Sequence, residues 1–133
     1  MKAPTVLKFD ASDAAPEVSF LAGDKLLAGN PQQTLWLHYT DPTRQFFAGV
    51  WRSEPGKWRI NYTEEEYCHL TEGVSVITDA EGRATTVTAG ESFVIPRGFN
   101  GTWEVVETTT KRFVIYDAGD EPLLRVRQRD PVG

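Results

Sequence analysis

The sequence predicts an all-β domain, either a sandwich or a barrel, and three observations support this prediction. Runs rich in Val, Ile, Thr and aromatic residues recur from Thr34 onward. Gly, Pro and Asp separate these runs at intervals of about 8–12 residues, which is typical of strands in sandwiches and barrels. Gly and Pro interrupt every window that would otherwise form a helix, so we expect at most a turn or two of helix.

The first 33 residues differ from the rest of the chain. They are rich in Ala, Asp, Gly and Pro, hold few aromatic residues, and end near the turn expected at Asn30-Pro31. We expect residues 1–33 to form an N-terminal arm that lies against the body of the protein or a partner chain, docked by Leu26 and Leu27. Residues 34–133 then form a single all-β domain.

The strands of that domain follow one another with clear breaks between them. The expected strands are Thr34–Tyr39, Phe46–Arg52, Lys57–Tyr62, Glu66–Leu70, Val74–Thr78, Ala84–Thr88, Ser92–Ile95, Gly101–Val106, Arg112–Tyr116 and Leu123–Gln128. The segment from Asp79 to Gly82 predicts a hairpin turn, because Gly82 can take the positive φ that such loops need. In the last strand, Arg125, Arg127 and Arg129 alternate on one face, which is typical of an exposed edge.

Composition and charge exclude several classes of partner. The net charge of −5 disfavours binding to nucleic acids and to anionic membranes. Cys68 is the single cysteine, so no internal disulfide forms and a reducing compartment is expected. The first ten residues lack the pattern of a secretory signal, and no run approaches the length of a membrane span. We therefore expect a cytoplasmic protein without a nucleic-acid or membrane partner.

Two motifs resemble those of the cupin superfamily. The segment from Gly90 to Gly98 is spaced as Gly, five residues, Pro, one residue, Gly, like the start of the second cupin motif. Glu66 stands seven residues before Gly73, like the end of the first motif. Further similarity to the ureidoglycine aminohydrolase and ethanolamine-utilisation branch lies at Trp51, Pro55–Trp58, Glu66–Gly73, Trp103–Val105 and Lys111–Phe113. Over roughly residues 46–116, the resemblance implies a double-stranded β-helix, the cupin jelly-roll barrel, with an internal ligand cavity. It also implies a homodimer in which the N-terminal arm takes part.

The histidines that hold a metal in such cupins are missing from this sequence. The corresponding positions hold Ile60 and Tyr62 or, in the other spacing, Arg59 and Asn61, and Gly101 replaces the later histidine. Only Glu66 remains, and a single carboxylate does not hold a transition metal. We therefore expect no metal cofactor.

Strand alternation predicts which side chains line the barrel. If Glu66 faces inward, so do Cys68 and Leu70. The expected cavity wall consists of Trp58, Ile60, Tyr62, Glu66, Cys68 and Trp103. A register change of one residue would instead turn Arg59 and Asn61 inward and make the pocket more polar.

Each candidate residue has a functional and a structural interpretation. Glu66 is either a general acid or base, working with Tyr62, or a carboxylate satisfied by Tyr62 or a backbone amide. Cys68 is a small buried residue, or a nucleophile if its pKa is lowered, or a metal ligand with Glu66 and a histidine. Trp58 and Trp103 pack in the core or stack on a planar or sugar-like ligand. Arg59 and Lys111 bind a carboxylate substrate or are solvated charges.

Three functions remain open on this basis. The first is binding of a small molecule in a metal-free cupin barrel that acts as a carrier or sensor. The second is an enzyme resembling ureidoglycine aminohydrolase, acting on a small nitrogenous or carboxylate compound through Glu66 and Tyr62. The third is a structural or interaction protein whose barrel is filled by its own side chains. A shared fold does not decide among them.

Overall fold

The computed structural model describes residues 3–118, most of which lie in strands. The elements of this part of the chain are a single 3-10 turn η1 (Phe9–Ala11) and the strands β1 (Glu17–Phe20), β2 (Leu26–Ala28), β3 (Gln32–Thr40), β4 (Phe46–Ser53), β5 (Gly56–Asn61), β6 (Glu65–Asp79), β7 (Ala84–Thr88), β8 (Ser92–Ile95) and β9 (Asn100–Tyr116). The predicted strand Leu123–Gln128 and its arginines lie outside the described residues. Within residues 3–118, no helix has the length and apolar character needed to cross a membrane.

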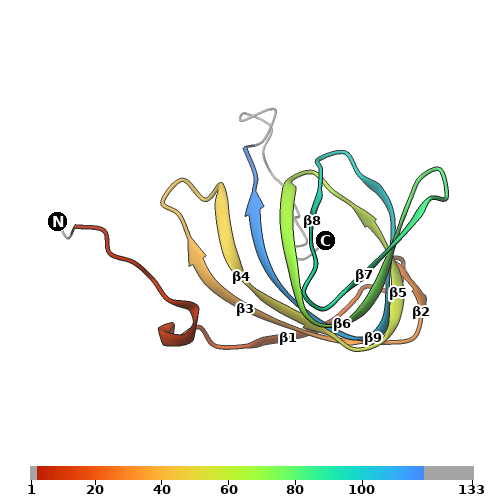
Figure 1. The fold of residues 1–133 in the computed structure, drawn as a ribbon, viewed down its shortest axis with the longest axis horizontal. Coiled ribbons are helices and arrows are strands. Elements are labelled where there is room, and N and C mark those ends of the chain that lie inside the picture. Colours follow the sequence, from red (N-terminus) through yellow and green to blue (C-terminus); the bar gives the residue numbers. More distant parts are fainter. Residues whose placement is uncertain (1–2, 119–133) are drawn as a thin grey trace.

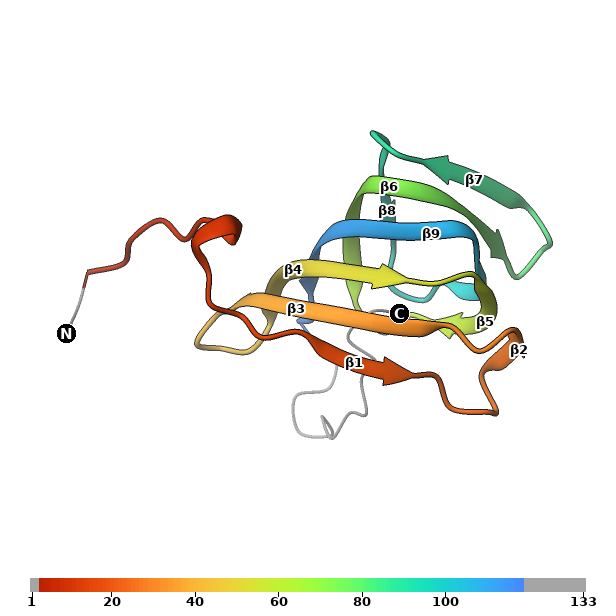
Figure 2. The same cartoon turned by 90° about the horizontal axis from the view of Figure 1, so that it is seen from below.

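The strands form one curled antiparallel sheet, which confirms the predicted all-β class (Figure 1). One path through the sheet runs β1-β3-β4-β9-β5-β2, and β6 pairs with β9, β7 and β8. Viewed down the curl in Figure 1, the strands enclose a half-barrel, and Figure 2 shows β1, β3, β4, β9 and β6 side by side along its wall. The architecture is that of the cupin jelly roll.

Two long strands replace four shorter ones that the sequence predicted. β6 runs through Gly73, where a break was expected, and β9 joins the predicted strands Gly101–Val106 and Arg112–Tyr116. Gly73 has φ +96°, and the pairing of β6 with β9 shifts register on either side of it. A glycine at a bulge lets a strand bend without ending. The bends allow one end of β9 to pair with β4 and the other with β5.

The predicted hairpin after β6 is confirmed. Gly82 has φ +86°, and its amide donates to the carbonyl of Asp79 at 3.0 Å. The Asp79 carboxylate also accepts hydrogen bonds from the amides of Glu81 and Arg83, each at 2.9 Å. These contacts fix the turn that pairs β7 with β6, with Val74 opposite Thr88 and Thr78 opposite Ala84.

The N-terminal segment contributes two short strands to the sheet. β1 pairs with β3 and forms one end of the strand path, and β2 pairs with β5. Before β1 the chain projects away from the sheet, as both ribbon views show. In this projecting part the Phe9 ring stacks on the His38 ring, with centroids 4.5 Å apart.

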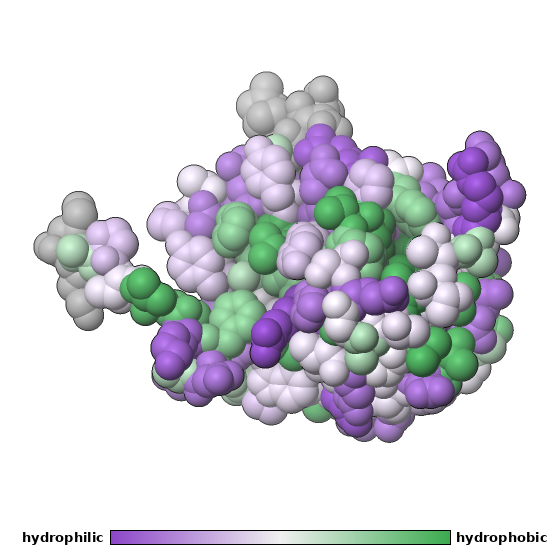
Figure 3. All heavy atoms as spheres, in the orientation of Figure 1, coloured by the Kyte–Doolittle hydropathy of each residue, from purple (hydrophilic) through white to green (hydrophobic). Residues whose placement is uncertain are grey.

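Aromatic side chains fill the middle of the curl. Trp51 contacts both Trp58 and Trp103 edge to face, at centroid separations of 6.1 and 5.5 Å. All three side chains are almost completely buried. In Figure 3, apolar residues show in the mouth of the curl, with hydrophilic residues around them. The core therefore lies on the concave face of the sheet, where a ligand of this fold would also lie.

Candidate functional site

A buried ion pair lies at the centre of the half-barrel. The ammonium nitrogen Nζ of Lys111 is 2.8 Å from Oε2 of Glu66, and both side chains are inaccessible to solvent. Tyr62 donates its hydroxyl hydrogen to the other carboxylate oxygen, Oε1, over 2.5 Å. One carboxylate is thus held between a cation and a phenol, in an interior that is otherwise largely apolar.

Three elements bring these side chains together. Glu66 lies near the start of β6, and Lys111 lies on the neighbouring β9, where its backbone pairs with Leu70. Tyr62 directly follows β5, and its backbone exchanges hydrogen bonds with the turn after β8, donating to Phe99 and accepting from Gly98, each at 2.8 Å. Because β6 and β9 share a long register, their inward-facing residues meet although they are far apart in sequence.

Two indole rings enclose the Lys111 ammonium. Nζ lies 4.6 Å from the centroid of the Trp51 ring and 4.4 Å from that of Trp103. A cation above an aromatic face is attracted by the ring quadrupole, most strongly where water is excluded. The Trp103 indole is fixed by donating to Oγ of Ser75 at 3.1 Å, and Ser75 in turn contacts the hydroxyl of Thr109 at 2.8 Å.

Burial sets the protonation of the two other weak acids in the cluster. Desolvation, followed by the negative charge of Glu66, raises the pKa of the Tyr62 phenol well above its ordinary value. The same two causes raise the pKa of the Cys68 thiol, and the nearby Lys111 only partly opposes them. A nucleophilic cysteine needs a lowered pKa. Cys68 is therefore a neutral thiol inside the core, and the interpretation of it as a nucleophile has no support here.

The structure brings most of the predicted site residues together. The residues with side chains in the buried interior are Trp58, Ile60, Tyr62, Glu66, Cys68, Trp103 and Lys111. Arg59 lies on the outside, where its guanidinium donates to the carbonyl of Asp24 at 3.1 Å. Asn61 is also exposed. The inward face of β5 is therefore the apolar one, and the alternative register with Arg59 inside is wrong.

The interior residues do not fit a transition metal. An ammonium already occupies the side of the Glu66 Oε2 atom, and Tyr62 donates to its Oε1 atom. Cys68 holds its proton, and neither histidine reaches the interior: His38 stacks on Phe9, and His69 contacts Oγ of Ser92 at 2.7 Å on the outer face. Among residues 3–118, no group of three or more His, Cys, Asp and Glu side chains is arranged to hold a metal ion.

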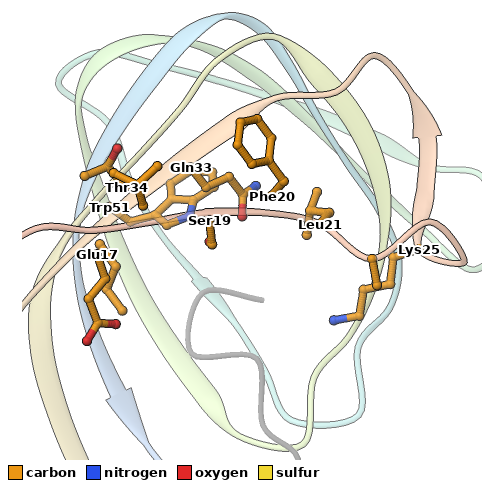
Figure 4. Close-up of a pocket in the computed structure, with 11 residues that line it drawn as sticks. Glu17, Ser19, Phe20, Leu21, Lys25, Gln33, Thr34 and Trp51 are labelled. Carbon is orange, nitrogen blue, oxygen red and sulfur yellow. The ribbon is translucent and has the colours of Figure 1, made fainter.

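A pocket of about 270 Å³ opens beside this cluster, on the inner face of β3 and β4 and along the edge strand β1 and the segment that follows it (Figure 4). Its lining includes Trp51, Gln33, Leu35, Leu21, Lys25 and Glu17. Trp51 is shared between the pocket and the cluster, because its ring also faces the Lys111 ammonium. Gln33 is not among the site residues predicted from the sequence. Its alternation with Leu35 in one strand was the signal that could have placed it on the inner face.

Comparison with known proteins agrees with this architecture. The family model of the EutQ-like cupin domain matches residues 40–113. No curated protein sequence matches the chain. A solved protein of unknown function from Pseudomonas syringae pv. tomato aligns with a TM-score of 0.70 at 21% identity, covering 79% of this chain and 45% of that chain. The present chain therefore spans less than half of that protein's length.

Two ethanolamine-utilisation proteins are similar in structure over most of their length. EutQ of Clostridium difficile aligns with a TM-score of 0.62 at 18% identity, covering 82% of this chain and 98% of that chain. A putative EutQ of Salmonella typhimurium aligns with a TM-score of 0.59 at 15% identity, covering 81% and 100%. At these identities the similarity shows a shared fold and does not carry over an activity.

Proposed function

This chain belongs to the family of EutQ-like cupin domains, and on that premise we propose that it binds a small organic molecule in its half-barrel without a metal ion. The ion pair between Lys111 and Glu66 carries this proposal. The Lys111 ammonium supplies, 2.8 Å from the carboxylate, the positive charge that a buried carboxylate requires. A divalent cation at the same carboxylate would be repelled by that ammonium at close range.

The pocket beside Trp51 supports the binding part of the proposal. Small-molecule sites are concave and mostly apolar, with a few polar groups that orient the ligand. The pocket combines the apolar side chains of Leu21 and Leu35 with the indole of Trp51 and the amide of Gln33. Its volume of about 270 Å³ lies just below the usual range of about 300–1,000 Å³, so it suits a ligand of metabolite size.

The ion pair supports one residue of the pocket wall. Trp51 lines the pocket, and the Lys111 ammonium lies over its ring. A residue held by packing and by its neighbours' charges presents its polar atoms to a ligand in a fixed direction, which reduces the ordering cost of binding. We therefore assign Glu66, Lys111 and Tyr62 a positioning role behind Trp51.

The enzymatic alternative has no single observation in its favour. Proton transfer by Tyr62 and Glu66 would require a substrate within hydrogen-bond reach of them. The Tyr62 hydroxyl instead donates to Glu66, and its raised pKa opposes release of the proton. The third alternative, a barrel filled entirely by side chains, predicts that no small molecule binds.

A ligand screen with and without metal tests the proposal. We expect small acids, amides or sugars to raise the melting temperature equally in EDTA and in buffer containing Mn²⁺, Zn²⁺ or Ni²⁺. A ligand at 100 times its Kd adds about 2.7 kcal/mol to the free energy of unfolding, which such a screen detects easily. Binding that appears only when metal is added would contradict the proposal. A complete failure of the screen would favour the side-chain-filled barrel.

A further inference from the structure

Two buried hydrogen-bond donors at the pocket find no acceptor among residues 3–118. The indole Nε1 of Trp51 and the amide Nε2 of Gln33 are buried, and within residues 3–118 no group accepts a hydrogen bond from either. Gln33 is 4% exposed and Trp51 0%. Buried donors without partners are rare and costly in folded proteins. By contrast, the equally buried Trp103 donates to Ser75.

Both donors belong to the wall of the same pocket. Gln33 lies on β3 opposite Ser53, and Leu35, two residues further along β3, lies opposite Trp51 on β4. Gln33 and Trp51 are therefore diagonal neighbours on the inner face, a separation that long and aromatic side chains can bridge. Figure 4 shows both side chains in the middle of the pocket, with Glu17 toward one end and Lys25 toward the other.

We propose that the ligand of this pocket is a small monocarboxylate whose oxygens accept hydrogen bonds from Trp51 Nε1 and Gln33 Nε2. This inference rests on the proposed function and specifies its ligand. A carboxylate accepts hydrogen bonds and donates none, so it matches a pair of donors. Hydrogen bonds to an ionised acceptor are also stronger than those between neutral groups.

The remaining lining residues determine which apolar group and which net charge the ligand can have. Lys25 adds a positive charge to the wall, and Leu21 and Leu35 provide apolar surface for a short hydrocarbon or ring. Glu17 lies at the other end of the pocket in Figure 4 and disfavours a second carboxylate there. The pocket therefore discriminates against dicarboxylates and against neutral compounds of the same shape.

Benzoate, benzamide and phthalate are suitable probes for this inference, with binding followed by NMR and by calorimetry on the full chain. We expect benzoate to shift the indole resonance of Trp51 and the side-chain amide resonance of Gln33 in a saturable manner. Benzamide and phthalate should bind at least about tenfold more weakly, a ratio that corresponds to about 1.4 kcal/mol.

Gln33→Leu is the decisive variant, and Gln32→Leu is its matched control on the exposed face of the same strand. Gln33→Leu should weaken benzoate binding about tenfold or more. It should leave the melting temperature of the ligand-free protein unchanged or higher, because an unsatisfied donor has been removed. Gln32→Leu should bind benzoate like the unmodified protein.

Two results would overturn the inference. The first is equal affinity for benzoate in Gln33→Leu and Gln32→Leu, and the second is equal affinity of the unmodified protein for benzoate and benzamide. If other compounds bind while benzoate shifts neither resonance, the carboxylate assignment fails and the proposed binding function stands. If no compound of the screen binds, both fail.

Discussion

Removing the Lys111 ammonium should destabilise the fold far more than removing an exposed charge. In Lys111→Met the side chain keeps much of its volume and its contacts with the two indoles, but Glu66 loses its cation. A carboxylate that is inaccessible to solvent then keeps the neutral Tyr62 hydroxyl as a donor but has lost the cation at its Oε2 atom. We expect the free energy of unfolding to fall by about 3–5 kcal/mol, the cost of leaving one member of a buried pair uncompensated.

The distance and the burial set this magnitude. At 2.8 Å and an effective dielectric constant of about 20, two unit charges attract by about 6 kcal/mol. Desolvation costs several kcal/mol for each ion and offsets much of this attraction. The intact pair therefore contributes little net stability, whereas either ion alone retains its desolvation cost. The double variant Lys111→Met, Glu66→Gln should consequently recover most of the stability that the single variants lose.

Urea unfolding of the unmodified protein, both single variants and the double variant measures this coupling directly. The comparison requires that the free energy of unfolding fall with urea concentration at the same slope in all four proteins. Arg83→Met is a matched control, because Arg83 Nε is also 2.8 Å from a carboxylate, that of Asp79, but 74% of its side chain is exposed. We expect this control to leave stability almost unchanged. The reasoning would be refuted if the double variant lost as much stability as the two single variants together. It would also be refuted if either single variant lost no more stability than Arg83→Met.

Further predictions concern the thiol, the bulge and the assembly. Folding raises the pKa of the Cys68 thiol, so the unfolded chain loses the thiol proton at a lower pH than the folded chain does. The free energy of unfolding should therefore be constant below about pH 8.5 and then fall by up to about 1.4 kcal/mol per pH unit. Urea titrations of Cys68→Ala should show a smaller fall over the same pH range. Gly73→Ala should lower the free energy of unfolding by more than about 1 kcal/mol, because a Cβ at this position would overlap the carbonyl oxygen of Thr108. Gly82 has a similar φ but open space around it, so Gly82→Ala should lower the free energy of unfolding by less in the same assay. Light scattering should give a homodimer of twice 14.9 kDa, since Val6 and Leu7 lie exposed on the projecting segment; a monomer at micromolar concentration would contradict this.

The inward face of the barrel strands could be predicted from the sequence because it depends on a local property. Side chains alternate along a strand, so the apolar set that includes Ile60 identifies the buried face of β5. The same rule places Glu66 and Cys68 inside together, and both are fully buried. A register error of one residue would have exposed the whole set, which is why a buried face specifies register strongly.

The partner of Glu66 could not be predicted in the same way. Lys111 comes from β9, and its distance from Glu66 depends on the long-range register of β6 and β9. The sequence does contain a partial signal, because Lys111 alternates with Phe113 and Ile115 and so shares their inward face. A lysine on an apolar face needs a buried counterion. From the sequence alone, Lys111 is instead predicted to bind a carboxylate substrate or to be a solvated charge.

The predicted strand ends at Gly73 and after Val106 were also wrong, for a related reason. Glycine marks both turns and bulges, and the two differ only in whether the neighbouring strand continues alongside. Here β9 continues past Gly73, so the glycine bends β6 and does not end it. Gln33 was missed because a polar residue on an inward face appears as an ordinary break in the apolar pattern.

The metal content of the protein, purified without chelators and measured by mass spectrometry, tests the central claim most directly. If the Lys111 ammonium takes the place of a cation at Glu66, the protein should contain far less than one transition-metal ion per chain. Its melting temperature should also be the same before and after dialysis against EDTA. One equivalent of manganese, iron, nickel or zinc that is lost together with stability on dialysis would contradict the account.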